Sequence, residues 1–383
     1  MGDIRVSPVE SRTYRKRFIK FPYELYKDER YWIPMLWIDQ EKLLNPKKNA
    51  FFEHGRIQPF LATDSNGAVV GRIAAIVNGA HLEKYDDGVG FFGFFDVRND
   101  YAVAEALLKA ATDWLKEQGL AAARGPANPS LNDIAGLLVD GFERYPALMM
   151  PYNPPYYEEF LERFGFRRVM TMWAYYIHLK YRKMDRLRRG AKIIERRNPG
   201  LTTRNLDMSK WDEEARLLLD IYNDAWSDNW GHVSMREREF KQLADEMKMI
   251  IDPTLIYILE LDGEPIGFSL TLPDVNVWFS EIRDGKLFPT GLVKLLKHKF
   301  FTPITECRTV MMGIRHGHQG KGYDVLLNLA VLDIPSQGSG YVGSEMSWIL
   351  DTNKPMINAV VGVGGVKDKE YAMFEKRLAT TTE

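Results

Sequence analysis

The sequence predicts an α/β protein in which one domain is duplicated, each copy having a mixed central sheet flanked by helices. Its 383 residues, 45% of them hydrophobic, exceed what a single ordinary core accommodates. Residues 57–78 have the pattern of a hairpin, with an alternating strand, a polar turn and a second strand through Gly71. Residues 254–276 repeat this pattern, and their corresponding glycine, Gly267, lies 196 residues after Gly71.

A helix that ends in glycine repeats at nearly the same spacing. An amphipathic helix over residues 156–166 ends at Gly165 and precedes a strand-like segment. A second helix begins at Asn353, ends at Gly364, 199 residues after Gly165, and also precedes a strand-like segment. The two offsets predict a tandem repeat with domains at 1–180 and 181–383.

Composition restricts the classes of function. Lys+Arg number 51 against Asp+Glu 52, so the net charge of −1 argues against a general nucleic-acid-binding surface. The single cysteine, Cys307, excludes an internal disulfide and a multi-cysteine zinc site, and no metal site is expected. Because no apolar run approaches a membrane span or a signal segment, we expect a cytosolic protein.

The most informative segment joins a strand to a helix through glycines. Residues 309–314 have strand character, and a helical pattern begins near Asp324, with Gly320 and Gly322 between them. Glycine allows positive φ and close approach of a ligand, and the first amides of a helix lack intrahelical acceptors. This combination predicts a cradle for a phosphate or pyrophosphate.

The spacing excludes two common phosphate-binding loops. A P-loop needs Ser or Thr after its lysine, but Lys321 is followed by glycine, and the dinucleotide fingerprint GxGxxG fails at Val325. The pattern [QR]xxGx[GA] fits at Gln319 and Gly322, with Asp324 in place of the usual small residue. In this pattern the segment resembles the pyrophosphate turn of the GNAT superfamily of acyl-CoA N-acyltransferases.

The resemblance extends over most of the chain. The C-terminal half is similar to a GNAT domain in its order of expected elements, which are a helix at 211–226, a hairpin at 254–272, a strand at 308–315, the turn at 319–324, a strand at 341–350 and a helix from residue 353. In the N-terminal half, Arg98-Asn99-Asp100 replaces the glycine turn, so only the C-terminal half is expected to hold CoA. Segments 30–36, 136–142, 152–166, 225–231 and 344–356 further resemble a bacterial group of tandem GNAT proteins, some of them linked to N-acylation of long-chain bases in ceramide synthesis.

The resemblance implies a donor, acetyl-CoA or a longer acyl-CoA, and a set of residues that hold it. The expected cofactor-binding residues are Gly313, Ile314, Gln319, Gly320, Lys321, Gly322, Tyr323, Asp324 and Asn353. Asn353 either contacts CoA or serves as the N-cap of its helix. The resemblance also implies a β-bulge near Met312 to Ile314 that offers a backbone N–H to the oxyanion. The tyrosine usual in the last GNAT helix is replaced here by Val360.

Two residues are candidates for acid–base chemistry. Glu345, in the alternating strand over 341–348, either faces the cleft as a general base or lies on the surface. Tyr371 either protonates the leaving thiolate or packs within the last strand.

The function implied is transfer of an acyl group from acyl-CoA to a small-molecule or lipid-like amine. The cationic and apolar residues of 291–301 predict either an amphipathic helix in peripheral contact with the inner membrane or an ordinary packed helix. Two alternatives remain. One is an aminoacyl or peptidyl transferase of similar tandem fold, to which the basic segment 181–197 would contribute a channel. The other is a non-catalytic CoA-binding module, favoured by Val360 and Asp324.

Overall fold

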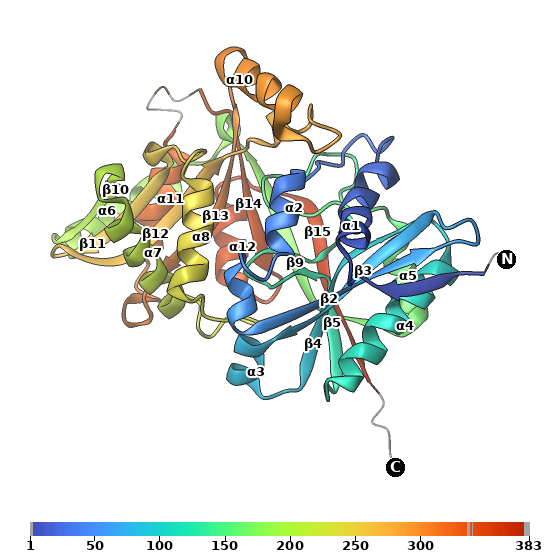
Figure 1. Ribbon diagram of the computed structural model, residues 1–383. Coiled ribbons are helices and arrows are strands. Elements are labelled where there is room, and N and C mark those ends of the chain that lie inside the picture. Colours follow the sequence, from blue (N-terminus) through green and yellow to red (C-terminus); the bar gives the residue numbers. More distant parts are fainter. Residues whose placement is uncertain (1–2, 335–337, 339, 379–383) are drawn as a thin grey trace. The chain divides into compact units, whose positions relative to one another are not determined.

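The computed structural model describes residues 3–334, 338 and 340–378 (Figure 1). The chain divides into two compact units. Unit 1 comprises Met1–Thr171, Asn276–Thr302 and Lys369–Glu383, and unit 2 comprises Met172–Val275 and Pro303–Asp368. Among the described residues, no helix has both the length and the apolar character needed to cross a membrane.

Unit 1 is built on a sheet with strand order β1-β2-β3-β4-β5-β15. Among the described residues, β4 and β5 pair in parallel and the other neighbours in this order are antiparallel. Short β8 also pairs with β15, and β6 pairs with β7 apart from this sheet. The strands are β1 (Arg5–Pro8), β2 (Gly55–Thr63), β3 (Val69–Asn78), β4 (Val89–Val97), β5 (Ala122–Gly125), β6 (Ala127–Asn128), β7 (Ile134–Ala135), β8 (Leu137–Asp140) and most of β15 (Val366–Arg377). The helices are α1 (Arg12–Leu25), α2 (Trp37–Leu43), η1 (Ala50–Glu53), α3 (Gly79–Tyr85), α4 (Tyr101–Glu117), α5 (Tyr156–Phe164), α9 (Asn276–Phe279), η5 (Leu287–Gly291) and α10 (Leu292–Phe301).

Unit 2 repeats this topology in the order β10-β11-β12-β13-β14-β9, where β13 and β14 form the parallel pair. The strands are β10 (Leu201–Asn205), β11 (Ile256–Leu261), β12 (Glu264–Pro273), β13 (Glu306–Ile314), β14 (Gly343–Leu350) and most of β9 (Arg167–His178). The helices are η2 (Leu179–Tyr181), α6 (Asp185–Arg197), η3 (Met208–Lys210), α7 (Trp211–Ala225), α8 (Glu237–Met247), η4 (Pro253–Leu255), η6 (His316–His318), α11 (Asp324–Leu332) and α12 (Lys354–Gly362). The α/β tandem repeat predicted from the sequence is confirmed.

The last strand of each half of the sequence lies in the other unit. Most of β9 belongs to unit 2, where it pairs with β14, and most of β15 belongs to unit 1, where it pairs with β5 and β8. Ala372 and Phe374 of β15 therefore lie in the core of unit 1 with Phe92 and Phe166. The units differ from the predicted single cut after residue 180, because the residues of a strand do not reveal which neighbour it pairs with.

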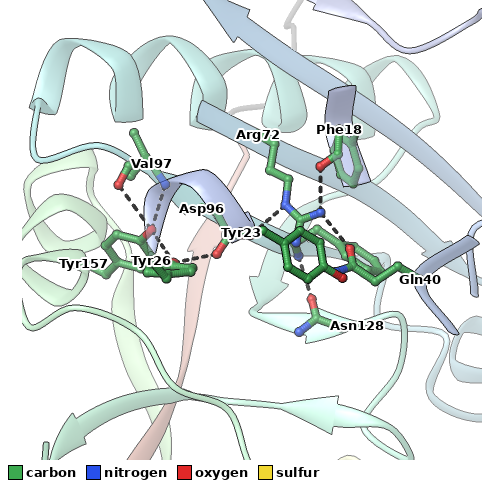
Figure 2. A network of polar contacts seen from close by, with 10 residues as sticks. Phe18, Tyr23, Tyr26, Gln40, Arg72, Asp96, Val97, Asn128 and Tyr157 are labelled. Atoms are coloured by element: carbon green, nitrogen blue, oxygen red, sulfur yellow. Dashed lines mark hydrogen bonds and ion pairs between the residues drawn. The ribbon is translucent and has the colours of Figure 1, made fainter. Parts of the chain in front are cut away.

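A buried arginine holds the first two helices on the sheet of unit 1 (Figure 2). Arg72 of β3 is ion-paired with Asp96 of β4, with Nε 2.6 Å from Oδ2. Its Nη1 also donates to the carbonyl oxygen of Phe18 in α1, at 2.9 Å, and to Oε1 of Gln40 in α2, at 3.0 Å. A buried charge is tolerated where it is paired and hydrogen-bonded in this way.

Two tyrosines continue this network to the end of β4 (Figure 2). Tyr26 Oη donates to Asp96 Oδ1 at 2.6 Å and lies 2.8 Å from Tyr157 Oη of α5. Tyr157 Oη accepts the N–H of Val97 at 2.7 Å. Burial raises the pKa of both tyrosines well above the ordinary value, so they act here as neutral hydrogen-bonding groups. The network thus positions α1, α2 and α5 around β3 and β4.

Candidate functional site

The predicted glycine turn lies between η6 and α11 of unit 2. Gly320 and Gly322 have φ of +72° and +77°, the left-handed conformation that glycine adopts without strain. A methyl group added at Gly320 would meet no atom within 4 Å, so the turn faces open space. In the part of the chain that the structure describes, the N–H groups of residues 320–323 donate to no other group. Consecutive free amides in such a turn form an anion-binding concavity.

Side chains on either side hold the turn in place. Gln319 Nε2 donates to the carbonyl oxygen of Ile314 at 2.8 Å and also lies 3.3 Å from that of Ala225. Lys321 Nζ donates to the carbonyl oxygen of Gly317 at 2.9 Å. The glutamine therefore closes the turn onto β13, which is a structural reason for its place in the motif.

Helix α6 supports the other side of the turn. Tyr323 is buried, and its hydroxyl donates to Asn198 Oδ1, just beyond α6, at 2.9 Å. Ile194 Cδ1 lies 3.4 Å from the position of a methyl group added at Gly322. From the sequence, the basic segment 181–197 is expected only to contribute a channel in the alternative aminoacyl or peptidyl transferase, and not to support the turn. The signal that could have placed it is the spacing of Leu187, Ala191 and Ile194, which form an apolar face against α11.

Tryptophan 226 packs on the strand that leads into the turn. A methyl group added at Gly313 would come within 2.2 Å of the Trp226 ring, which also contacts Tyr222 and Phe268. Trp226 therefore anchors the segment 225–231 on β12 and β13 within unit 2. Gly313 is needed for that close approach, and Ile314 supplies the carbonyl oxygen that Gln319 binds.

Strands β13 and β14 part next to the turn. Among the described residues their paired positions end at Thr309 and Met346, although β13 continues to Ile314 and β14 to Leu350. The backbone groups of a strand point alternately to its two neighbours, so alternate N–H groups of residues 310–314 face the side where β14 has diverged.

The bulge in β13 lies at Val310. Leu270 pairs with Met311 and Thr271 pairs with Thr309, which leaves Val310 without an opposite residue on β12. The prediction of a bulge near Met312 to Ile314 was wrong, because those residues pair regularly with β12. The buried hydroxyls of Thr271 and Thr309, 2.9 Å apart, fix the register on the other side of the bulge.

Glu345 lies where the two strands part. It is opposite Arg308, one position before the last pair of the parallel ladder, and its side chain is only 6% exposed. Ser347 Oγ donates to Glu345 Oε1 at 2.5 Å, and Arg308 Nε donates to Ser347 Oγ at 2.9 Å. The alternative of a carboxylate on the protein surface is therefore wrong. This chain of hydrogen bonds fixes the orientation of the Glu345 carboxylate.

Two curated relatives match nearly the whole chain. The bacterial ceramide synthase of Caulobacter vibrioides is 36% identical over 387 residues, which cover 98% of this chain and 98% of the relative. Protein YghO of Escherichia coli is 32% identical over 366 residues, covering 95% of this chain and 93% of that protein. The chain belongs to the family of these proteins. Their full-length match also agrees with the subgroup resemblance seen in the sequence.

Solved structures show that the chain has the tandem GNAT fold. A tandem GNAT protein from the clavulanic acid biosynthesis pathway has a TM-score of 0.58 at 12% identity and covers 98% of both chains. A GCN5-related glucosamine N-acetyltransferase region in a fungal multi-domain β-N-acetylglucosaminidase has a TM-score of 0.60 at 13% identity and covers 98% of this chain and 38% of that one. No protein-family model matches the sequence.

The remaining predicted residues of this family member have defined positions. Asn353 Oδ1 accepts the N–H of Met356 at 3.2 Å, so Asn353 caps α12. Val360 is buried within unit 2. Tyr371 is fully buried on β15 in unit 1, whereas Glu345 belongs to unit 2. Burial raises the pKa of the Cys307 thiol to about 12, so this cysteine is not a nucleophile at neutral pH.

Among the described residues, unit 1 of this family member does not repeat the consecutive row of unpartnered amides at the corresponding junction, because the N–H of Arg98 donates to the carbonyl oxygen of Val70 at 3.1 Å and that of Asp100 to the carbonyl oxygen of Arg98 at 2.6 Å. The N–H of Phe94, which has φ of +50° at the bulge of β4, donates to Asn128 Oδ1 at 2.6 Å. A methyl group added at Gly93 would lie 1.8 Å from the carbonyl oxygen of Ala127, so β6 fills the space beside the bulge. Asp100 caps α4 through the N–H of Ala102 at 2.9 Å. The two junctions therefore differ, and the consecutive row of unpartnered amides lies in unit 2.

Asp324 occupies the first position of α11, beside the free amides. Its side chain does not cap the helix, since the N-cap residue is Tyr323 and no side-chain cap bond forms. Burial raises the pKa of the Asp324 carboxyl above its ordinary value. A carboxyl with a raised folded-state pKa favours folding while it is protonated and opposes folding as pH rises through that pKa.

We expect Asp324→Asn to raise the melting temperature at pH 8 and to have little effect near about pH 3, below the ordinary pKa of an aspartate, where the carboxyl is mostly protonated in both states. The same change removes a negative charge beside the amides, so CoA should bind about three- to tenfold more tightly at low salt, with a smaller gain at high salt. Thermal unfolding and titration calorimetry at two pH values and two salt concentrations measure both effects. Equal or weaker CoA binding by the variant would contradict a diphosphate at this helix terminus.

Proposed function

We propose that this protein is an acyl-CoA-dependent N-acyltransferase that holds the diphosphate of CoA at the turn 319–324. The observation that carries the proposal is the row of unpartnered N–H groups at residues 320–323, beside the open space at Gly320. His318 Nδ1 also is buried without a partner in the described part of the chain. Amide and imidazole donors at a helix N-terminus suit a diphosphate.

The proposed site uses backbone groups of unit 2 to hold and polarise the donor. Residues 320–323 bind the diphosphate, and Gln319 keeps their amides in place through Ile314. An N–H of residues 310–314, on the side where β14 has diverged, donates to the oxyanion that forms at the thioester carbonyl. Much of the acceleration then comes from fixing the thioester and the amine at a productive distance.

Glu345 is proposed as the general base of the reaction. An ammonium group must lose a proton before its nitrogen attacks the thioester, and a carboxylate oriented at the parting of β13 and β14 can accept it. The neutral amine nitrogen then attacks the carbonyl carbon and forms the new amide bond while the carbon–sulfur bond breaks. The second proton of the nitrogen passes to the departing sulfur, directly or through solvent, so that CoA leaves as the free thiol. Arg308 and Ser347 position the base.

A long-chain, lipid-like amine is the proposed acceptor. The name of the Caulobacter relative supports this class of substrate, and that protein matches over the full chain. The exposed apolar residues of 291–301 support peripheral contact with the inner membrane, where such an amine would be found.

Binding and product formation test the proposal together. Binding of CoA, acetyl-CoA and palmitoyl-CoA to the full-length protein is followed by thermal shift. The protein is then incubated with each of the two acyl-CoA donors and either a long-chain base or a short amine. We expect stabilisation by CoA and N-acylation of the long-chain base. Stabilisation without any N-acyl product would favour a non-catalytic CoA-binding module. No stabilisation by any of these donors would favour an aminoacyl or peptidyl transferase.

The role of Tyr371 as proton donor to the leaving thiolate stays a prediction. Its complete burial in unit 1 favours packing, because a donor must reach the sulfur atom. We therefore expect Tyr371→Phe, which removes only the hydroxyl, to keep kcat within about threefold of the wild type, below the effect typical of a general acid. Steady-state rates across pH measure this. A fall of tenfold or more together with loss of the basic limb would establish Tyr371 as the acid.

A further inference from the structure

Helix α10 is rich in apolar residues, yet none of its residues is buried. Six of its ten residues are Leu, Val or Phe. Phe300 and Phe301 are 75% and 78% exposed, and Val293 is 66% exposed. The main contacts of α10 with other elements are to η5 and α9, which belong to the same insertion. A folded protein rarely leaves such a helix uncovered unless the helix has an external partner.

Four exposed apolar residues of α10 form a stripe along one face, and Phe301, the last residue of the helix, lies outside it. Leu292, Leu296 and Phe300 recur every four residues, and Val293 lies beside them, three and seven residues before Leu296 and Phe300. We call these four residues the apolar stripe. Their side chains are all exposed. The half-buried positions of the helix, Leu295 and His298, lie away from this stripe.

Lysines border the apolar stripe. Lys297 follows Val293 by four residues and lies along one edge, while Lys299 follows Leu292 by seven residues and lies along the other. Residues 286–301 contain four lysines, among them Lys286 and Lys294, and no acidic residue. The whole chain carries a net charge of −1, so the positive charge of this segment is local. A cationic border around apolar side chains complements an anionic lipid surface.

The base of the insertion is firmly attached to unit 1. Arg283 Nη2 donates to the carbonyl oxygens of Tyr26 and Glu29, at 3.1 and 2.5 Å, and Nη1 donates to that of Trp32 at 2.5 Å. The N–H of Trp37 donates to the carbonyl oxygen of Gly285 at 2.8 Å. These bonds join the insertion to the end of α1 and the start of α2, so α10 is presented on a fixed support.

We propose that η5 and α10 dock this protein on an anionic lipid bilayer. The apolar stripe enters the boundary between headgroups and acyl chains, Lys297 and Lys299 contact lipid phosphates, and Phe288 of η5, 65% exposed, extends the contact. The docking would give the protein access to an amine in the membrane, and this role of the docking rests on the proposed function. A second copy of the chain fits this face less well, because two identical lysine-bordered stripes would repel each other.

Vesicle binding tests the docking surface. The full-length protein is sedimented with vesicles of phosphatidylcholine alone or with about one third phosphatidylglycerol. We expect binding to the anionic vesicles that weakens as salt rises. Val293→Ser/Phe300→Ser should lower the partition coefficient about 10- to 100-fold, because two apolar side chains no longer enter the lipid. Lys297→Glu/Lys299→Glu should lower it about 30-fold on anionic vesicles and change nothing on neutral ones.

A matched double variant controls for loss of exposed apolar surface. Met249 and Val366 are 87% and 68% exposed and lie outside the insertion, so Met249→Ser/Val366→Ser should bind vesicles as the wild type does. Circular dichroism and the thermal shift with CoA show that each variant is folded. Unchanged vesicle binding by the stripe variant, or equal losses in the control variant, would overturn the docking surface. A dimer that dissociates in the stripe variant, without vesicle binding by the wild type, would assign the face to a second copy and overturn it as well.

The outcomes separate this inference from the proposed function. The stripe variant should keep the wild-type thermal shift with CoA and the wild-type rate toward a short water-soluble amine, because the turn 319–324 and Glu345 lie in unit 2 and the insertion lies in unit 1. If the wild type binds vesicles but does not bind CoA, the proposed function is refuted and the docking surface stands.

Discussion

Replacing Glu345 by glutamine is expected to lower kcat by about 10²- to 10⁴-fold, the contribution typical of a general base. Glutamine keeps the size of the side chain and can still accept the hydrogen bond from Ser347, which lies 2.5 Å from Glu345 Oε1. It cannot take a proton from the attacking amine. The affinity for CoA should stay within about twofold, because the amides of residues 320–323 are unchanged. Steady-state rates and calorimetric titration with CoA separate the two quantities.

The matched control for this variant is Glu306→Gln. Glu306 also belongs to the paired part of the β13–β14 ladder, and its Oε1 accepts the hydroxyl of Tyr176 at 3.1 Å. We expect kcat of that variant to remain within about threefold of the wild type, since the loss of one charge at a structural position leaves the proton acceptor intact. If both variants lose activity equally, or if Glu345→Gln keeps full activity, a water molecule and not Glu345 accepts the proton.

The positioning residues of Glu345 show what the sequence could not supply. Alternation along residues 341–348 predicts a strand, but it leaves open which face of the strand is buried. The burial and orientation of Glu345 depend on Arg308, which lies 37 residues before Glu345 in the sequence. The Arg308 guanidinium reaches Ser347 only because β13 and β14 pair in parallel at this point. A strand contact between distant segments is set by the whole sheet, so a local pattern does not specify it.

The glycine turn was predictable because its conformation is local. Positive φ at Gly320 and Gly322, and the start of α11 at Asp324, follow from residues within a few positions of one another. The apolar face of helix α6 is visible in the sequence. Helix α6 was nevertheless not predicted as part of the site, because its residues do not indicate that this face packs against α11. The assignment of most of β9 to unit 2 and most of β15 to unit 1 was not predicted either, because the residues of a strand do not indicate which strand it pairs with.

The bulge of β13 was only partly predictable, unlike the glycine turn, which is determined locally, and the strand contacts, which depend on the whole sheet. A resemblance to the superfamily implies that a bulge exists, while its residue is set by how Thr271 and Thr309 lock the register with β12. The bulge at Val310 is near the last paired residue, Thr309, so the strand becomes irregular where β14 diverges. The position of the backbone N–H that is proposed to stabilise the oxyanion therefore depends on the contact between Thr309 and Thr271 of the neighbouring strand.

Replacing Gly320 by valine is expected to weaken CoA binding by at least about 100-fold. Valine at φ near +72° is strained by roughly 1–2 kcal/mol or more, so the backbone leaves the conformation that aligns the amides. The new side chain would also occupy the open space in front of the turn. Losing two hydrogen bonds to a charged diphosphate, at about 1.5–3 kcal/mol each, corresponds to a factor of this size. Calorimetric titration of the folded variant with CoA measures the change.

Gly263→Val is the control for Gly320→Val, because it introduces the same backbone strain at a position that does not face the proposed CoA site. Gly263, in the turn between β11 and β12 of the same unit, has φ of +84°, and a methyl group added there would also meet no atom within 4 Å. Both variants should lower the melting temperature by a similar few degrees, since both place a β-branched residue in the left-handed region. Only Gly320→Val should lose CoA, because only its amides face the proposed diphosphate. Equal CoA affinity in the two variants would show that the turn after Gln319 does not bind the donor, and the assignment of acyl transfer to this turn would fail with it.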